Sequence, residues 1–559
     1  IGEQAGLGGT TSAPYSSGQN NTALGYKALT AFTTGGDNTA VGYQAGDAVT
    51  TGVRNTIMGM QAATGLTTGQ HNVMIGAYTG YQTTDLDGAV LIGYQAGYGG
   101  NMTSAADGTV AIGFQAMNNL TTGQRNTGVG SGILYTNSSD GDDNTAMGYQ
   151  AGFYNYKGGS NTHFGAYAGH YATGSYNTFI GKDAGKGGQT SAPYSSGTYN
   201  TGLGYQALAG FTTGYGNTAV GTQALDAVTE GFYNIGIGPS AGGSITTGDY
   251  NIAIGYAAFD AATTAGSTIA IGYAALSAYT HAENSFNVAI GTQTAYLKTS
   301  GRFNTYIGGY KVADADLTGQ YNAYFGPYTN QFGTDADNTT LIGYSAGRYA
   351  TGSFNTFVGS EAGKGGTTSA PYSSGRYNVA IGRSALAAFT TANYTIAIGN
   401  NAGNEITTGD YNTVIGYEAG SELKDDTGNT FLGAYSGYMV ESDENTFVGY
   451  EAGEGSSGNT TGGQNTAVGY RSMENYTTAN QNVAVGDAAL QLKTTGNQNV
   501  SIGMRASQYN IVGTSTVHIG ALVGRYATGS YNTFIGAQAG VGGTTSAPYS
   551  SGQYSTAVG

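Results

Sequence analysis

Two histidines stand at equivalent places in the chain and are its best candidates for metal ligands. His163 and His518 each lie two residues before a recurrent glycine, Gly165 and Gly520. Imidazole nitrogens bind transition metals, so three such histidines around an axis shared by three chains would offer a three-His ion site. Leu341 occupies the corresponding place between them. Since one of three equivalent places lacks the ligand, packed or surface histidines are favoured over an ion site.

Pairs of aspartates separated by one residue precede several predicted strands. Their carboxylate oxygens are the ligand type that Ca²⁺ prefers. The glycine-rich nonapeptide of calcium-binding β-rolls is absent from the sequence, and the pairs fall in different repeats. Solvated turns are therefore favoured over calcium sites. The pairs are Asp85 with Asp87, Asp140 with Asp142, Asp314 with Asp316, and Asp335 with Asp337.

The sequence does not predict an enzyme. No Ser/His/Asp or Cys/His arrangement stands out, and Gly236-Ile237-Gly238 resembles a phosphate loop only because the repeat is rich in glycine. Glycosidase chemistry needs a specific carboxylate pair in a groove. The longest repeat has 23 residues, which leaves little room for a catalytic insertion. We expect no catalytic residues and no cofactor.

Composition and charge exclude several other classes of protein. The chain has 559 residues, of which 99 are glycine, 6 are proline and none is cysteine, so it is neither a collagen nor a disulfide scaffold. Its net charge is −15 with basic residues dispersed singly, which disfavours a nucleic-acid partner. No stretch approaches 18 consecutive apolar residues, so we expect no membrane insertion in this segment.

A single motif recurs through the whole chain and explains the composition. Asn38-Thr39-Ala40-Val41-Gly42-Tyr43-Gln44-Ala45 is a clear copy, and 32 glycines correspond to Gly42, usually 17 residues apart. Each copy predicts a short strand, a tight bend at the glycine and a second short segment. One such unit cannot bury its apolar residues alone, whereas stacked units can. The sequence thus predicts an all-β, parallel β-solenoid with one repeat of about 17 residues per rung.

Four positions of the repeat are assigned structural roles. The apolar residue before the glycine is expected to form a continuous buried ladder, and the asparagine an amide ladder at a turn. The glycine permits a close backbone approach or a positive φ. The tyrosine after it is expected to stack along the axis, with a sugar-binding aromatic surface as the alternative. The representative residues are Asn38, Val41, Gly42 and Tyr43 in one rung and Asn217, Val220 and Gly221 in another.

The opposite strand face is expected to point outward and to meet other chains. It carries small or aromatic residues that alternate with the Val and Ile ladder. Examples of this second face are Ala40, Ala146, Ala253, Phe357 and Phe534.

The sequence also repeats at a longer period of about 178 residues, which spans several of the 17-residue repeats. Each block has ten rungs and begins with a 23-residue rung that contains Thr-Ser-Ala-Pro-Tyr-Ser-Ser-Gly. This spacing indicates duplication of a ten-rung block. The expected blocks are 1–180, 181–358 and 359–535, with the start of a fourth at 536–559.

The Pro-Tyr insertions are the candidate contact loops of the solenoid. They recur once per block and lengthen the rung, so we expect them to project from the surface. Their residues are Pro14 and Tyr15, Pro193 and Tyr194, Pro371 and Tyr372, and Pro548 and Tyr549.

The Asn-Thr-Ala-Val-Gly-Tyr-Gln-Ala motif with Thr-Thr-Gly connectors resembles two related groups of repeats. One group is the heads of trimeric autotransporter adhesins, and the other is the shafts of phage-tail-fibre-like proteins. The resemblance covers all copies and implies a left-handed parallel β-roll that assembles as a homotrimer. Two features depart from it: the adhesin heads usually have a shorter rung, and no heptad stalk, anchor or chaperone domain occurs in this segment.

The resemblance implies a structural shaft of an extracellular fibre that mediates attachment. Such a shaft would associate with itself, as a trimer and end to end, and would bind cell-surface glycans or proteins. A purely structural extracellular or matrix filament without a specific ligand is the alternative. An ice-binding solenoid is a minor alternative because spaced threonines can match an ice lattice, although the connectors vary, with Arg54, Glu230 and Ala392 at or near their ends.

Overall fold

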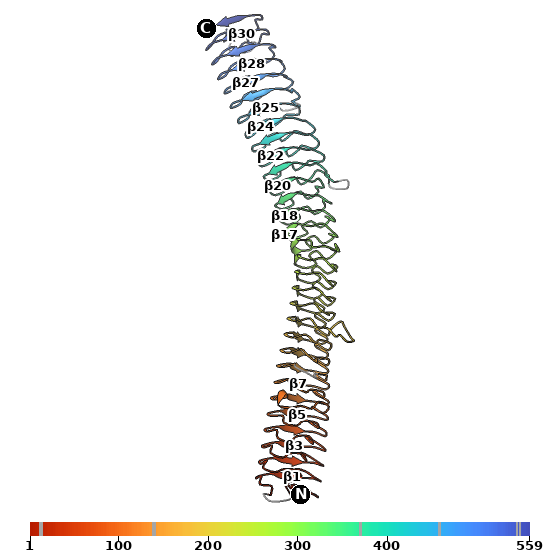
Figure 1. Cartoon of the computed structure of the whole chain (residues 1–559). Helices are drawn as coiled ribbons and strands as arrows, with labels where there is room; N and C mark the ends of the chain where they lie inside the picture. Colours follow the sequence, from red (N-terminus) through yellow and green to blue (C-terminus); the bar gives the residue numbers. More distant parts are fainter. Residues whose placement is uncertain (11–14, 137–140, 368–371, 457–459, 544–545, 547–548) are drawn as a thin grey trace. The chain divides into compact units, whose positions relative to one another are not determined.

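The structure is a computed structural model that describes the chain except residues 11–14, 137–140, 368–371, 457–459, 544–545 and 547–548. It contains two compact units, Ile1–Phe286 and Asn287–Gly559, which we call unit 1 and unit 2 and describe separately. Each is a parallel β-solenoid in which every rung contributes one short strand (Figure 1). The predicted fold class is therefore confirmed.

The described residues of unit 1 contain fifteen strands, each of three residues, and one turn of 3-10 helix, η1. In chain order these are β1 (Thr22–Leu24), β2 (Thr39–Val41), β3 (Thr56–Met58), β4 (Val73–Ile75), β5 (Val90–Ile92), η1 (Ser104–Ala106), β6 (Val110–Ile112), β7 (Thr127–Val129), β8 (Thr145–Met147), β9 (Thr162–Phe164), β10 (Thr178–Ile180), β11 (Thr201–Leu203), β12 (Thr218–Val220), β13 (Ile235–Ile237), β14 (Ile252–Ile254) and β15 (Ile269–Ile271).

The described part of unit 2 contains sixteen strands, of which the first two are longer than the others. They are β16 (Val288–Thr292), β17 (Thr305–Tyr310), β18 (Ala323–Phe325), β19 (Thr340–Ile342), β20 (Thr356–Val358), β21 (Val379–Ile381), β22 (Ile396–Ile398), β23 (Thr413–Ile415), β24 (Thr430–Leu432), β25 (Thr446–Val448), β26 (Thr466–Val468), β27 (Val483–Val485), β28 (Val500–Ile502), β29 (Val517–Ile519), β30 (Thr533–Ile535) and β31 (Thr556–Val558).

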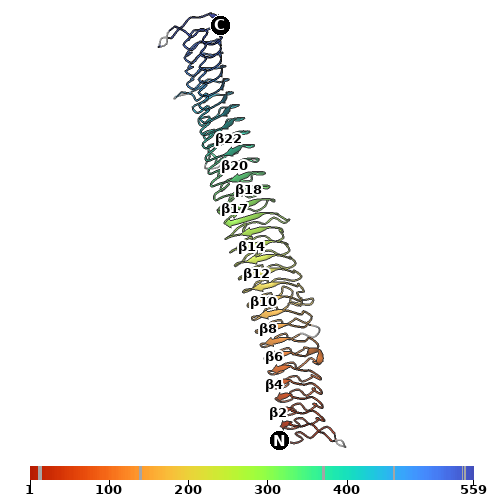
Figure 2. The ribbon, with the colours of Figure 1, turned by 90° about the vertical axis from the view of Figure 1, so that its left-hand side faces the viewer.

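Neighbouring strands within each unit pair in parallel and in register with the repeat. Thr39 pairs with Thr56, Ala40 with Ile57 and Val41 with Met58. Figure 2 shows the strand arrows one after another along one side of the coil. The register shifts between β16 and β17, where Ile290 pairs with Ile307 but Thr292 pairs with Tyr310. The extra residue that causes this bulge is a second glycine, Gly309, after Gly308.

The turns between strands are also held together from rung to rung. The Gln44 N–H donates to the Tyr26 carbonyl at 2.8 Å, and the Thr33 N–H donates to the Thr50 carbonyl at 2.8 Å. Many turn backbone groups therefore find their partners in the adjacent rung, whereas others pair within the rung, as the Ala45 N–H does with the Gly42 carbonyl.

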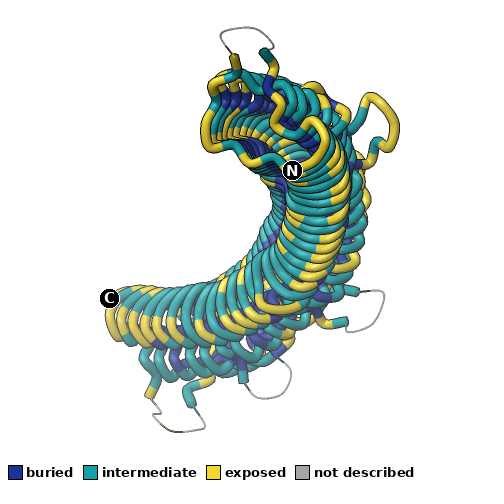
Figure 3. Tube along the Cα trace, turned by 90° about the horizontal axis from the view of Figure 1, so that it is seen from below, coloured by how far each residue is buried: buried dark blue, intermediate teal, exposed yellow. Residues whose placement is uncertain are grey.

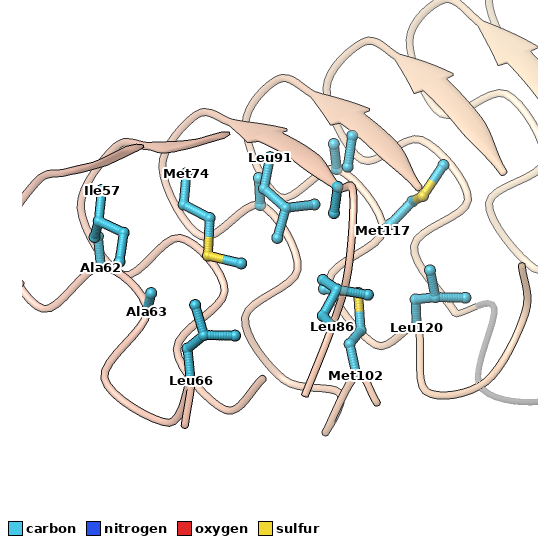
Figure 4. Close-up of a cluster of buried hydrophobic side chains, with 14 of the residues drawn as sticks. Ile57, Ala62, Ala63, Leu66, Met74, Leu86, Leu91, Met102, Met117 and Leu120 are labelled. Atoms are coloured by element: carbon cyan, nitrogen blue, oxygen red, sulfur yellow. The ribbon is translucent and has the colours of Figure 1, made fainter. Parts of the chain in front are cut away.

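The hydrophobic core runs inside the coil and is built from the middle residue of each strand. Ile57, Met74 and Leu91 point inward from β3, β4 and β5 onto side chains such as Leu66 and Leu86 of the turns (Figure 4). Buried and exposed residues consequently recur at fixed places of successive rungs (Figure 3).

The expectation about the two strand faces is wrong. Ala40 is fully buried, whereas Val41 before the glycine is only half-buried and faces outward. Ala146, Ala253, Phe357 and Phe534, which we expected on the outside, are buried as well. Alternation along a strand defines two faces but does not say which one is inside.

Large inward rings are accommodated by glycine. A Cβ atom on Gly363 would lie 2.3 Å from the Phe357 ring, and one on Gly185 would lie 2.2 Å from the Phe179 ring. Each glycine follows its aromatic residue by six positions. The coil thus keeps a constant width because a large side chain on the strand is matched by a missing one on the turn.

Candidate interaction surface

The outer strand face forms an uncharged stripe along each unit. It consists of the first and third residues of each strand, such as Thr39 and Val41. In the described strands β1–β31 these two columns hold Thr, Val, Ile, Ala, Leu, Met and Phe, apart from the extra residues of β16 and β17, and no charged residue. Ile237 is 39% exposed and Ile342 is 40% exposed. Contiguous exposed apolar surface of this kind marks protein interaction sites.

The glycine that follows each strand is required by the next rung. A Cβ atom on Gly42 would lie 2.3 Å from the Gly59 carbonyl oxygen, and one on Gly221 would lie 2.7 Å from that of Gly238. Both glycines also have positive φ angles, 140° and 133°. The close approach and the positive φ that the sequence suggested as alternatives occur together.

The asparagine that precedes most of the described strands lies in a buried hydrogen-bonded ladder. The backbone N–H and the side-chain Nδ2 of Asn55 both donate to Asn38 Oδ1, each at 3.0 Å, and Asn38 Nδ2 donates to the Gly52 carbonyl at 2.9 Å. Asn217 repeats the pattern on Asn200 and on the Gly231 carbonyl. This ladder satisfies backbone groups at the turn into the strand and fixes the position of the outer face.

The tyrosines after the glycine stack only where neighbouring rungs both carry a ring. Tyr43 and Tyr26 are parallel, with ring centroids 5.4 Å apart, and Tyr256 stacks on Tyr273 at 5.6 Å. Tyr43 is nevertheless half-exposed. This column therefore borders the uncharged stripe with partly exposed aromatic rings.

A second aromatic column, which the sequence analysis missed, lies one residue before the asparagine. One run of it in unit 2 joins four rings: the ring centroid of Phe354 is 4.9 Å from that of Tyr377, Tyr377 is 5.0 Å from Tyr394, and Tyr394 is 5.1 Å from Tyr411. These rings are within 5° of parallel. Their shared place before the asparagine was a readable signal, since it recurs through consecutive rungs.

The structure places both candidate metal-binding histidines inside their own coil. His163 is 1% exposed, stacks on Phe179 at 5.7 Å, and neither ring nitrogen has a hydrogen-bond partner. His518 stacks on Phe534 and pairs with Ser507. Burial lowers the pKa of each imidazole to about 4. Histidines on the inner face do not reach a second chain, so they do not form the three-chain ion site.

The aspartate pairs mostly serve the backbone of the neighbouring rung. Asp87 Oδ1 accepts a hydrogen bond from the Gln70 N–H at 2.7 Å, and Asp337 Oδ1 accepts one from the Gln320 N–H at 2.8 Å. Asp140 lies outside the described residues. Asp316 differs from the solvated turn that we expected, because it is fully buried beside Lys298. Asp314 is partly buried near Lys311.

One group of acidic residues in the described part of unit 2 has the spacing of a cation site. Carboxylate oxygens of Glu451, Glu454 and Glu474 lie within 4.8 Å of one another. Burial and the two neighbouring carboxylates raise the pKa of Glu454 to about 7. Arg471 donates to Glu451 and lies 3.8 Å from Glu474, so the arginine already balances part of this charge.

The tyrosine of each Pro-Tyr insertion packs back onto the coil where its neighbours are present. The ring centroid of Tyr194 lies 4.6 Å from that of Tyr154 and 5.9 Å from that of Tyr171. Tyr372 contacts Phe332 and Tyr349 in the same way, and Tyr549 contacts Tyr509 and Tyr526. Pro193 and Tyr15 are exposed, whereas Pro14, Pro371 and Pro548 lie outside the described residues.

Within the described ranges, the model contains no helix with the length and apolarity needed to cross a membrane. Comparison with models of known protein families finds no match to this chain, and comparison with curated proteins finds none either.

Proposed function

We propose that the chain is the shaft of an extracellular fibre in which three copies pack against one another along their outer strand faces. The observation that carries the proposal is the uncharged stripe of Thr, Val and Ile on every rung of both units. A chain that works alone would gain solubility from charged residues on these columns, as on its connectors. The resemblance of the repeat to adhesin heads and tail-fibre shafts supports three as the number of copies.

The geometry of the stripe suits a lengthwise contact. Its side chains repeat at the strand spacing of about 4.8 Å, so a second chain with the same spacing can meet it rung by rung. The β-branched residues of the stripe lose little conformational freedom on contact, which favours association. The fibre would hold a binding element away from a surface or would itself attach to cell-surface glycans or proteins.

The mass of the intact chain in solution tests the assembly. We expect light scattering to give three times the mass of the 56.6 kDa chain. A monomer or a dimer at micromolar concentration would contradict the proposal.

A matched pair of variants locates the contact. Ile237→Lys with Ile254→Lys places two charges on the outer face of adjacent rungs, and the assembly should then dissociate at a higher protein concentration than the wild type does. Thr247→Lys with Thr264→Lys adds the same charge to exposed connectors and should leave the mass unchanged. Equal effects of the two pairs would place the contact elsewhere.

Attachment is separated from a purely structural role by a binding assay. Fluorescent wild-type fibre should bind to a cell surface or to immobilised glycans, and a matrix filament without a ligand would not. Replacement of the exposed loop residues Ser191, Ala192 and Pro193 by glycine tests whether this projection makes the contact. Unchanged binding would remove the loop from the proposed surface.

A further inference from the structure

Lys298 and Asp316 form a buried pair inside the first two rungs of unit 2. Both side chains are 0% exposed. They occupy a column of the turn that is apolar in most other rungs, where Val49, Leu66 and Phe389 lie. The rungs involved carry β16 and β17 (Figure 1), whose pairing contains the register shift. A charged pair in this column has a large desolvation cost that an apolar pair would not have.

Every polar atom of the pair is held by a defined partner. Lys298 Nζ lies 3.4 Å from Asp316 Oδ2 and donates to the Gly319 carbonyl at 2.7 Å. The Gly319 N–H donates to Asp316 Oδ1 at 2.9 Å, and the Tyr306 hydroxyl donates to Asp316 Oδ2 at 2.7 Å. One carboxylate oxygen thus faces a backbone donor, and the other faces an amine and a phenol.

Burial favours the uncharged forms of Lys298 and Tyr306. It lowers the pKa of Lys298, against the opposing effect of Asp316, so a free amine becomes more accessible than in water. It raises the pKa of Tyr306 well above the usual value, so this hydroxyl keeps its proton and remains a donor. Transfer of one proton within the pair gives a neutral amine beside a neutral carboxylic acid.

We infer that Lys298 and Asp316 are the site of an intramolecular amide cross-link between successive rungs. The lone pair of Lys298 Nζ attacks Asp316 Cγ, the Nζ–Cγ bond forms, and the Cγ–Oδ2 bond breaks. Oδ2 leaves as water with two of the three ammonium protons, and the third stays on the amide nitrogen. No oxidant, reductant or co-reactant is needed, and the product carries no buried charge.

The contacts of the pair match the requirements of this step. The Gly319 N–H points to Oδ1, where negative charge develops when the carbonyl carbon becomes tetrahedral. The Tyr306 hydroxyl hydrogen-bonds to Oδ2 and assists its departure. Two reactants fixed in contact have an effective concentration of about 10⁵ M or more, and the buried site excludes the water that would reverse the reaction.

A second buried pair provides an internal comparison. Lys493 and Asn510 lie in the same column of adjacent rungs, with Nζ 3.3 Å from Oδ1. The Gly513 N–H donates to Asn510 Oδ1, and the Gly513 carbonyl accepts from Lys493 Nζ, as at Gly319. The strand position that corresponds to Tyr306 is Ser501, whose hydroxyl pairs with Ser507. The leaving nitrogen, Asn510 Nδ2, donates to the Thr516 hydroxyl at 3.5 Å. Since that hydroxyl accepts a hydrogen bond from the leaving group and does not donate one to it, we expect this pair to stay unlinked.

Intact-mass measurement of the full chain tests the inference directly. We expect a mass lower than the sequence mass by one water molecule, and a branched peptide after proteolysis that joins the segments of residues 298 and 316. A wild-type mass equal to the sequence mass would overturn the inference. A loss of ammonia mapped to residues 493 and 510 would overturn the role assigned to the Tyr306 hydroxyl.

Variants distinguish the loss of water at Lys298 and Asp316 from a loss of water at other residues of the chain. Lys298→Met with Asp316→Leu restores an apolar column and should have its full sequence mass, whereas Lys493→Met should still lack one water. Tyr306→Phe should raise the unlinked fraction of freshly folded protein. If the water loss persists in Lys298→Met with Asp316→Leu, the modified residues lie elsewhere and the inference fails.

Discussion

The inner and outer faces of the strands differ in how their residues vary along the chain. On the inner face, side-chain size changes from Ala40 to Phe179, and His163 and Tyr306 also occur there. On the outer face, β-branched and aliphatic residues of similar size recur in almost every rung. The inner face can vary because each rung packs mainly against itself and its two neighbours, with a glycine opposite the rings of Phe179 and Phe357. The uniform outer face is the basis for the proposed contact with a partner that has the same repeat.

The largest loss of stability on substitution is expected at an aromatic residue inside the coil. Phe357→Ala leaves a cavity above Gly363 and should reduce the free energy of unfolding by about 3–5 kcal/mol. Val358→Ala, on the outer face of the same strand, should cost less than about 1 kcal/mol in dilute, dissociated protein. Denaturant titration of both variants checks the comparison, and equal losses would contradict the assignment of the faces.

The asparagine ladder between the two faces should be the next most sensitive place. Asn251→Ala removes the acceptor of the Thr268 N–H and the donor to the Ala265 carbonyl, so we expect a loss of about 2–4 kcal/mol. Asn251→Thr should cost less, because threonine already occupies this column at Thr268. Hydrogen exchange of the neighbouring rungs measures the difference. Full tolerance of alanine would show that the ladder does not hold the rungs together.

The buried histidine makes the inner face sensitive to acid. Burial lowers the pKa of His163 from 6.5 to about 4, so the unfolded chain binds more protons between these values. Stability should therefore fall as the pH drops from about 6.5 to about 4, by at most about 3 kcal/mol from this residue. His163→Leu copies the residue at Leu341 and should remove this part of the pH dependence. If the free energy of unfolding of His163→Leu depends on pH in the same way as that of the wild type, this prediction is contradicted.

The smallest effect is expected at the exposed aromatic column. Tyr394→Ala interrupts the stack between Tyr377 and Tyr411 and should cost about 0.5–1.5 kcal/mol. Tyr394→Phe retains the ring and should be close to neutral. Thermal melts of the two variants check this, and a loss as large as that of Phe357→Ala would mean that the outer columns carry the stability.

The rung, the parallel stacking and the fold class could be predicted from the sequence, because the glycine and the asparagine that each rung needs recur at a nearly fixed spacing. The sequence did not predict which strand face is buried. Val41 is more hydrophobic than Ala40, and hydrophobicity alone selects the wrong face. A feature consistent with the inner face is the glycine six residues after an inner phenylalanine, as Gly363 follows Phe357 and Gly185 follows Phe179.

The buried Lys298 and Asp316 pair escaped the sequence analysis for a different reason. The extra Gly309 shifts Asp316 by one position relative to other rungs, so it reads as part of a surface turn. Only the register across the bulge shows that it shares a column with Lys298. Side-chain chemistry at an irregular rung therefore needs coordinates, whereas regular rungs can be read from their spacing.

The asparagine ladder has a consequence for how such a gene changes over time. Each rung offers its successor the same Oδ1 acceptor and the same glycine surface, as Asn38 does for Asn55 and Gly42 for Gly59. A copied stretch of whole rungs would therefore meet its new neighbours through contacts that already exist. Recombination between repeats can lengthen or shorten the protein without the invention of a new interface, and length becomes a trait that selection adjusts in steps.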